Sequence, residues 1–471
     1  MTELTDFSFT DTLEPVYIKD GDKLQEKWLK VTQIGAFDFT KPIKEILTNS
    51  EPLKKVLNFQ LLDVSLFRCK KCGAIIKSEK KPNECSECER ISDFEVITGN
   101  IDIQKNLWKI PTWEDIDVDM LGVYDDLIAL LKRTIKFTEP IQYKLFALWI
   151  IATYKHPLWE TVPYLHLKGL PASGKTRAME MARLLAYRSV LVSGITFTAI
   201  VRINHNFNVT LLIDEIDTKL DERTETGRDF VAFLKPGYKK GQLYIASDLN
   251  DQTKVCYYNN YGFKILSGEK GIYSEALISR SLTFDMEQDY PEVNSLSEIE
   301  SECNQLKTKL LNYRFKTDTP DVLSQEIPLK ARSREIFDCL LRTAQHIGQP
   351  IDDLLEYAKA MEETAINDMQ GTVEWDILNI LHEFSCQGTL DAREGAKISE
   401  ILEKLEWTED PKKSSQRLGY ILKNMGLVTK RKRDGMWIFF IEPRNDRKLN
   451  YLFRRYKIGA VKTEVNTQCI L

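Results

Sequence analysis

The spacing of apolar residues changes along the chain and divides it into regions. Stretches before residue 110, such as "FQLLDVSLFRC" and "FEVITGNIDI", alternate apolar and polar positions as half-buried strands do. Farther on, short continuous apolar runs predict fully buried strands, and helical spacing lies between them. The chain is therefore predicted to be multidomain, with a β-rich beginning and an α/β middle.

Three apolar runs in the middle region predict buried strands that are each followed by, or end in, residues with useful chemistry. "YLHL" precedes a glycine-rich loop, "VTLLI" precedes Asp214 and Glu215, and "FKILSG" ends in Ser267. His166 in the first strand is interpreted as a packed core residue, and Asp217 as a surface residue. The longest apolar run, "LFALWIIATY", is too short to span a bilayer and predicts a buried helix beside this core.

The last quarter of the chain has the pattern helix, helix, helix, β-hairpin. "VEWDILNILHEF", "KISEILEKL" and "KKSSQRLGYILKNMG" have the spacing of amphipathic helices, and "LVTKRKRDGMWIFFIEP" predicts two strands around Asp434-Gly435. This order is that of a winged helix, followed by a short basic helix and a tail.

Charge changes the interpretation of this last region. The chain has 471 residues and a net charge of −5, but residues 411–458 hold 14 Lys or Arg against three acids, a local +11, which leaves −16 for the rest. Such a basic segment favours a polyanion-binding end over a merely solvated tail. The third helix would offer Lys412, Lys413 and Arg417 to a DNA groove, and the wing would offer Lys430, Arg431, Lys432 and Arg433 to phosphates. A protein-docking winged helix is the alternative.

Four cysteines near the beginning have metal-ligand spacing. The pairs Cys69-x2-Cys72 and Cys85-x2-Cys88 are separated by twelve residues, and Gly73 follows the first pair. Two such knuckles present four thiolates in the tetrahedral arrangement that Zn²⁺ favours. The ribbon at 69–88 is either only a structural staple or also a nucleic-acid contact, because several lysines surround it.

The stretch "GLPASGKT" spells G-x-x-x-x-G-K-T between a predicted strand and a predicted helix. Glycines free the backbone of such a loop so that its N–H groups can surround phosphate oxygens. Lys175 is expected to reach the β and γ phosphates of ATP, and Thr176 to bind Mg²⁺. The nucleotide-binding residues are therefore Gly169, Leu170, Pro171, Ala172, Ser173, Gly174, Lys175 and Thr176.

The acids after the second strand complete this site. Asp214 suits a role in the outer coordination sphere of Mg²⁺, and Glu215 is placed to orient and activate the attacking water. Together with the phosphate loop, about forty residues upstream, they predict ATP hydrolysis rather than an ordinary acidic turn.

With these motifs the chain resembles the AAA+ ATPase superfamily, over roughly residues 118–360. Ser267 stands at the position that the superfamily uses as sensor 1, and "EALISRSLTFDM" resembles the arginine-finger segment of minichromosome-maintenance (MCM) helicases. The resemblance implies that Arg280 reaches a nucleotide bound by a neighbouring subunit, in a homo-oligomer that is usually a hexameric ring. "KARSREIFDCLLRTAQHIG" resembles the lid of related plasmid and viral ATPases, with Arg332 at the sensor 2 position and Arg334 as the alternative.

A hairpin is predicted between the acid strand and sensor 1, from "QLYIASD" and "KVCYYNN". MCM-type helicases push such a hairpin into their central channel, where Lys239, Lys240 and Lys254 would contact DNA. An ordinary surface hairpin is the alternative. The predicted organisation is a β-rich domain with zinc ribbon (1–110), an AAA+ core (111–290), a helical lid (291–370), a winged helix (371–445) and a basic end (446–471).

The expected function is an ATP-driven AAA+ motor on DNA, single-stranded or forked, most simply an MCM-like replicative helicase or initiator of a mobile element. The alternatives are an ATP-switched DNA-binding regulator or partition protein, and a protein remodeller. ATP, Mg²⁺ and Zn²⁺ are the expected cofactors. The first residues lack an apolar signal segment and most cysteines are scattered, so a cytoplasmic, nucleoid-associated protein without membrane contact is expected.

Overall fold

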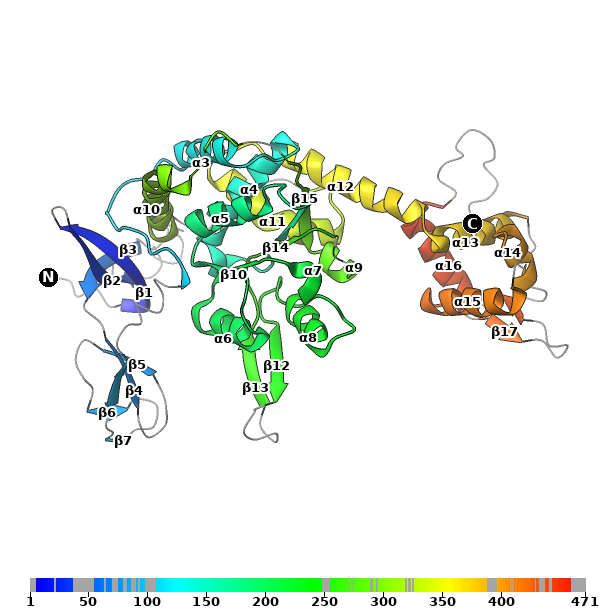
Figure 1. Cartoon of the computed structure of the whole chain (residues 1–471), viewed down its shortest axis with the longest axis horizontal. Helices are drawn as coiled ribbons and strands as arrows, with labels where there is room; N and C mark the ends of the chain where they lie inside the picture. The colour runs from blue at the N-terminus through cyan, green and yellow to red at the C-terminus, as the bar shows by residue number, and fades with distance from the viewer. Residues whose placement is uncertain are drawn as a thin grey trace, which may run out of the picture. The chain divides into compact units, whose positions relative to one another are not determined.

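The computed structural model shows two compact units, residues 1–355 and 356–471 (Figure 1). Each unit is described by itself. The residues that the structure describes are 6–20, 23–36, 55–62, 65–69, 75–78, 83–85, 90–91, 94–97, 107–247, 255–270, 272, 274–288, 291–293, 295–317, 320, 323, 326–387, 396–407, 410–427, 429–431, 437–439 and 443–458.

Small antiparallel sheets make up the described part of the first hundred residues. A long hairpin of β1 and β2 is extended by β3, β4 lies between β5 and β8, and β6 pairs with β7. The strands are β1 (Asp6–Asp20), β2 (Lys23–Ala36), β3 (Lys55–Leu62), β4 (Ser65–Cys69), β5 (Ile75–Ser78), β6 (Glu84–Cys85), β7 (Arg90–Ile91) and β8 (Phe94–Ile97). Backbone hydrogen bonds from Tyr17 N to Pro111 O (3.0 Å) and from Trp113 N to Tyr17 O (2.8 Å) join β1 to the segment that leads into the core.

A five-stranded parallel sheet forms the centre of the first unit, with the order β10-β11-β14-β9-β15. Its strands are β9 (Tyr164–Lys168), β10 (Ser189–Val192), β11 (Thr210–Ile213), β14 (Lys264–Gly268) and β15 (Ser281–Asp285). They are mostly apolar and mostly buried, because helices cover the sheet. All carboxyl ends of the strands meet at one edge, and all amino ends at the other.

Helices surround this sheet (Figure 1). α5 packs against β10, β11 and β14, and α4 packs between α3 and α11. The helices are α3 (Met120–Thr134), α4 (Pro140–Thr153), α5 (Lys175–Leu185), α6 (Phe197–Phe207), α7 (Ile216–Lys219), α8 (Glu225–Leu234), α9 (Glu275–Ile278), α10 (Glu300–Lys316) and α11 (Ala331–His346), with 3-10 turns η1 (His156–Leu158) and η2 (Leu296–Glu298). A further helix, α12 (Asp352–Gln370), begins in the first unit and belongs mostly to the second. The predicted buried helix is confirmed, because residues 145–152 of α4 are at most 1% exposed. Within the described ranges, no helix combines the length and the apolar character needed to cross a membrane.

The predicted hairpin before the sensor strand is also confirmed. β12 (Leu243–Ser247) and β13 (Val255–Asn259) pair in antiparallel register, with Ile245 opposite Tyr257. Tyr244 on one face packs edge-on against Phe197 and Phe233 of the core. The other face is open to solvent, with four apolar side chains that are 50–59% exposed: Leu243, Ile245, Val255 and Tyr257.

The second unit is a small helical domain with a three-stranded antiparallel sheet of order β16-β18-β17. Its elements are α13 (Val373–Cys386), β16 (Ala396–Lys397), α14 (Ile398–Lys404), α15 (Pro411–Asn424), β17 (Thr429–Arg431), β18 (Trp437–Phe439) and α16 (Pro443–Arg455). Leu378, Leu381, Ile401, Leu418 and Leu422 form the centre of its core. The amphipathic spacing of the three predicted helices reflects burial in this core.

Candidate functional site

The loop after β9 has a tightly turned backbone that depends on its glycines. Gly174, directly before α5, has a left-handed φ of 87°, and Ala172 has φ 65°. A Cβ on Gly169 would lie 2.4 Å from the carbonyl oxygen of Met286 and 2.5 Å from Ser173 Oγ, so only glycine fits there. The loop therefore packs against the residue that follows β15, and it leads directly into the N-terminus of α5. The partial positive charge of a helix N-terminus favours an anion at that point.

Lys175 lies across this loop. Its Nζ donates to the carbonyl oxygens of Gly169 (2.6 Å) and Leu170 (2.8 Å) and lies 3.4 Å from Ser173 Oγ. The ammonium is thus held at the loop centre by main-chain groups. Ser173 is buried, whereas Leu170 is 76% exposed and Pro171, Ala172 and Thr176 are also exposed. One side of the loop is therefore open to a ligand.

The two acids lie at the same edge of the sheet, directly after β11. Asp214 is half-buried; its Oδ1 accepts from the backbone N–H of Glu215 at 2.9 Å, and its carbonyl accepts from Lys219 Nζ at 2.6 Å. Glu215 is exposed and has a left-handed φ of 53°. A non-glycine residue in that conformation is uncommon and is found more often at functional sites.

Ser267 lies between the phosphate loop and the acids, because β14 lies between β9 and β11. Its side chain is fully buried, and its hydroxyl has no hydrogen-bond partner among the described residues. A buried hydroxyl without a partner is costly, so a native structure usually offers it a ligand or water. The phosphate-loop edge, as we call it, consists of residues 169–176, Asp214, Glu215 and Ser267.

Asp217 was interpreted from the sequence as a surface residue, and that interpretation is wrong. Its half-buried carboxylate accepts the backbone N–H groups of Glu269 (2.6 Å) and Lys270 (3.2 Å) in the loop after β14. A Cβ on Gly268 would lie 2.8 Å from both carboxylate oxygens. Asp217 therefore ties the loop after β11 to the end of β14, where Gly268 leaves room for its carboxylate.

Arg280 and Arg332 lie together, but at the opposite edge of the sheet. Their guanidinium groups contact the ring of Tyr238, with Cζ 4.8 Å and 5.1 Å from its centroid. Arg332 Nη1 also donates to Tyr238 Oη (2.5 Å) and Glu335 Oε2 (2.6 Å), whereas Arg334 is exposed. We call this group, with Lys239 paired to Glu335 at 3.5 Å, the Tyr238 cluster.

The Tyr238 cluster is separated from the phosphate loop by the length of the central strand. Arg280 precedes β15, and the backbone of Tyr238 pairs with Val162 before β9 begins. The loop starts after Lys168, at the other end of β9. Five strand residues span about 16 Å, so both arginines are remote from the phosphate loop of their own chain.

The remaining predicted residues are dispersed. Lys240 Nζ donates to Pro157 O at 2.9 Å, beside the base of the hairpin rather than on it. On α15, Lys412, Lys413 and Arg417 are exposed; Lys413 pairs with Asp410 at 3.3 Å, and Arg417 lies over the ring of Trp407. Side chains outside the described residues are those of Lys254, Lys430, Arg431, Lys432, Arg433, Cys69, Cys72, Cys85 and Cys88, although Cys69 ends β4 and Cys85 ends β6.

Comparisons with known proteins assign no family. No family model matches the chain, and no curated protein matches it. The chain is similar to two solved structures of the C-terminal region of NrS-1, each described as the A form of the apo protein. The first, of residues 305–718, is 9% identical with a TM-score of 0.36 and covers 81% of this chain and 96% of that chain. The second is 11% identical with a TM-score of 0.35 and covers 77% and 83%.

Proposed function

We propose that this chain is an AAA+ ATPase that uses ATP hydrolysis to move along or unwind DNA. One observation carries the proposal: the parallel sheet brings the phosphate loop, Ser267 and the two acids to a single edge. Phosphoryl transfer to water requires a site for the phosphate, a polar group beside it and a base that activates water. The loop, Ser267 and the acids would supply these three parts.

The residues of the phosphate-loop edge fit Mg²⁺ and ATP by their donor chemistry. The unpartnered hydroxyl of Ser267 and the open hydroxyl of Thr176 suit polar ligands beside the loop. Thr176 and Asp214 would hold Mg²⁺, which would neutralise charge on the phosphates. Lys175 would bind phosphate oxygens, and Glu215 would accept a proton from the attacking water.

The Tyr238 cluster supports a homo-oligomer, most simply a hexameric ring. An arginine stabilises phosphoryl transfer only when it reaches the transferred phosphate. Because Arg280 and Arg332 lie at the far edge of their own sheet, each would act on nucleotide bound by a neighbouring subunit. Arg332 rather than Arg334 is proposed as the lid sensor, because only Arg332 lies beside Arg280 on the Tyr238 ring.

DNA contact would come from the hairpin of the first unit and from the second unit. Three helices, α13 to α15, are followed by the β17–β18 hairpin, and β16 completes its sheet, which supports a winged helix. Exposed lysines at the start of α15 would contact phosphates. The small sheets around Cys69 and Cys85 favour a Zn²⁺ ribbon, for which we expect about one zinc per chain, lost in Cys85→Ser.

The test is ATP hydrolysis with and without single-stranded DNA, with a forked duplex measured in parallel and Lys175→Ala as the blank. Stimulation by the single strand together with strand displacement would support the motor. Nucleotide-dependent duplex binding without unwinding would instead favour an ATP-switched regulator. A rate of ATP hydrolysis that DNA does not change would reject a DNA motor and favour a protein remodeller.

A further inference from the structure

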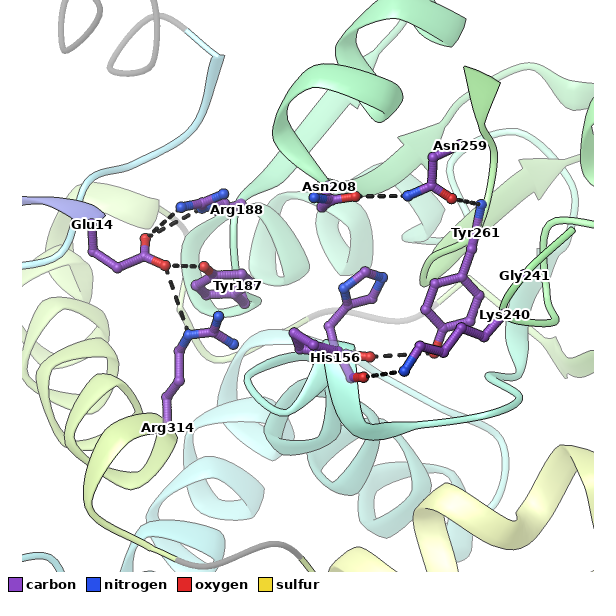
Figure 2. Close-up of a pocket in the computed structure, with 11 residues that line it drawn as sticks. Glu14, His156, Tyr187, Arg188, Asn208, Lys240, Gly241, Asn259, Tyr261 and Arg314 are labelled. Atoms are coloured by element: carbon purple, nitrogen blue, oxygen red, sulfur yellow. Dashed lines mark hydrogen bonds and ion pairs between the residues drawn. The ribbon is translucent and has the colours of Figure 1, made fainter. Parts of the chain in front are cut away.

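A cavity of about 330 Å³ lies away from the phosphate loop, at the amino ends of β10 and β11. Figure 2 shows it between two groups of side chains: Glu14, Tyr187, Arg188 and Arg314 on one side, and His156, Lys240 and Tyr261 on the other. We call it the Glu14 pocket. Its size is at the lower end of the range for small-ligand sites.

The described lining of the pocket carries three cationic side chains and one carboxylate. Glu14, only 3% exposed, accepts from Arg188 Nη2 at 2.9 Å and from the hydroxyl of Tyr187, and lies 3.7 Å from Arg314 Nε. One carboxylate is therefore shared by two guanidinium groups, while Lys240 adds a further positive charge. Buried charge of one sign favours a ligand of the other sign.

Two nitrogen atoms in the pocket wall have no hydrogen-bond partner among the described residues. They are Nε of Arg314 and Nε2 of His156. The guanidinium Cζ of Arg314 lies 4.3 Å from the centroid of the Tyr187 ring, and the His156 ring stacks on the Tyr261 ring with centroids 4.8 Å apart. Burial, and then the positive charges of Arg314, Lys264, Arg188 and Lys240, lower the pKa of His156 to about 3. The imidazole is thus neutral at pH 7, and the groups around it create a positive potential.

We propose that the Glu14 pocket is a second phosphate-binding site, suited to one nucleotide unit. Two guanidinium groups and an ammonium match phosphate oxygens, and Tyr187 and Tyr261 add aromatic side chains to the lining. The pocket adjoins the base of the hairpin, because Gly241 precedes β12 and Asn259 ends β13. The phosphate comes either from a DNA strand that follows the hairpin, which rests on the proposed function, or from a free nucleotide.

The experiment uses the full chain with Lys175→Ala in every sample, so that the ammonium of the phosphate loop is absent. Two probes are titrated: a fluorescein-labelled single-stranded oligodeoxynucleotide, by anisotropy at several salt concentrations, and inorganic pyrophosphate, by calorimetry. Lys240→Gln removes a pocket cation from an exposed position and so should not disturb folding. Glu14→Gln removes the carboxylate. Lys309→Gln is the control, a half-buried lysine on the same helix as Arg314 that is paired with Asp126.

We expect opposite responses from the two pocket variants. Lys240→Gln should weaken binding about fivefold and, for the oligonucleotide, lower the salt slope by about 0.7. Glu14→Gln should tighten binding by a similar factor, and Lys309→Gln should change neither probe. A response of the oligonucleotide assigns the site to DNA phosphate, and a response of pyrophosphate assigns it to a free nucleotide.

Equal affinity of Lys240→Gln and Lys309→Gln for both probes would overturn the pocket proposal. That result leaves the motor proposal untouched, because DNA-stimulated hydrolysis is measured with intact Lys175. Conversely, hydrolysis that ignores DNA, together with pyrophosphate binding that depends on Lys240, would reject the DNA motor and retain the pocket.

Discussion

The two edges of the central sheet are built in different ways. The phosphate-loop edge is made of residues that directly follow strands, so strand, loop and helix together form it from short stretches of sequence. The opposite edge is made of long side chains from distant segments: Arg280 from before β15, Arg332 from α11, and Arg188 and Arg314 around Glu14 of β1. The first edge is thus assembled from local segments, whereas the second brings together cations from segments that are far apart in the sequence, several of them already paired with Glu14 or Glu335.

The largest effect is expected from removing the cation of the phosphate-loop edge. Lys175→Ala should lower ATP turnover by about 100-fold or more, because no other described ammonium lies in the loop. Lys168→Ala is the matched control, since Lys168 ends β9, the strand before the loop, and pairs with Asp285 at 3.5 Å. Steady-state hydrolysis of both variants measures the difference, and similar turnover in the two would argue against the assignment of Lys175.

The second-largest effect is expected from removing the arginines of the opposite edge. It tests whether these arginines act on nucleotide that is bound by a neighbouring subunit. Arg280→Ala should retain nucleotide binding but lose most turnover, by about 100-fold. Arg332→Ala should behave in the same way, and Arg334→Ala should not. Each is compared by nucleotide affinity and by steady-state hydrolysis.

Mixing variants separates action between subunits from action within one chain. Lys175→Ala keeps Arg280, and Arg280→Ala keeps Lys175, so a mixed oligomer contains some interfaces with both. Partial recovery of hydrolysis on mixing is expected. Strictly additive, near-zero activity across all mixing ratios would contradict an arginine donated by the neighbour.

A third prediction concerns pH, because buried histidines lie both in the central strand and at the opposite edge. Burial lowers the pKa of His166 to about 4 and that of His156 to about 3. The pKa of a histidine in the unfolded chain is about 6.5. Below this pH the unfolded chain binds protons that the folded chain does not bind, so the free energy of unfolding should fall as pH falls from 6.5 towards the folded pKa values.

The slope should approach about 1.4 kcal/mol per pH unit for each histidine. Urea midpoints from pH 7.5 downward would measure it. His156→Gln should flatten the loss more than His166→Gln, because its pKa is lowered further. Parallel curves for wild type and both variants would show that other groups control the acid sensitivity.

The smallest effect is expected at Asp217, which joins two loops of the phosphate-loop edge. Asp217→Asn keeps the size but directs an amide N–H₂ at backbone donors, so we expect a loss of about 1–2 kcal/mol in the free energy of unfolding. Asp221→Asn is the control, since Asp221 pairs locally with Arg223. Chemical denaturation compares the two variants, and equal denaturation midpoints would show that Asp217 does not stabilise the fold by joining the two loops.

Much of the secondary structure could be predicted because its signals are local. The strand β9 with its loop and helix, the acid strand, the β12–β13 hairpin and the helices α13 to α15 all follow from periodicity and turn residues. The β1–β2 hairpin was not predicted, since its polar-rich sequence has no clear alternation. The close packing of Asp217 on Gly268 was also missed, because nothing in the adjacent sequence names its partner.

The sequence alone predicted a glycine-rich loop after β9 and two acids directly after β11, because each of these features consists of residues that follow one another along the chain. Only the tertiary structure decided that β14 places Ser267 between them, and that Arg280 meets Arg332 on Tyr238 instead of approaching its own loop. It also decided that Glu14 is shared by Arg188 and Arg314, roughly 170 to 300 residues away in the sequence. Long side chains meet where strands and helices pack, and spacing along one segment does not encode that meeting.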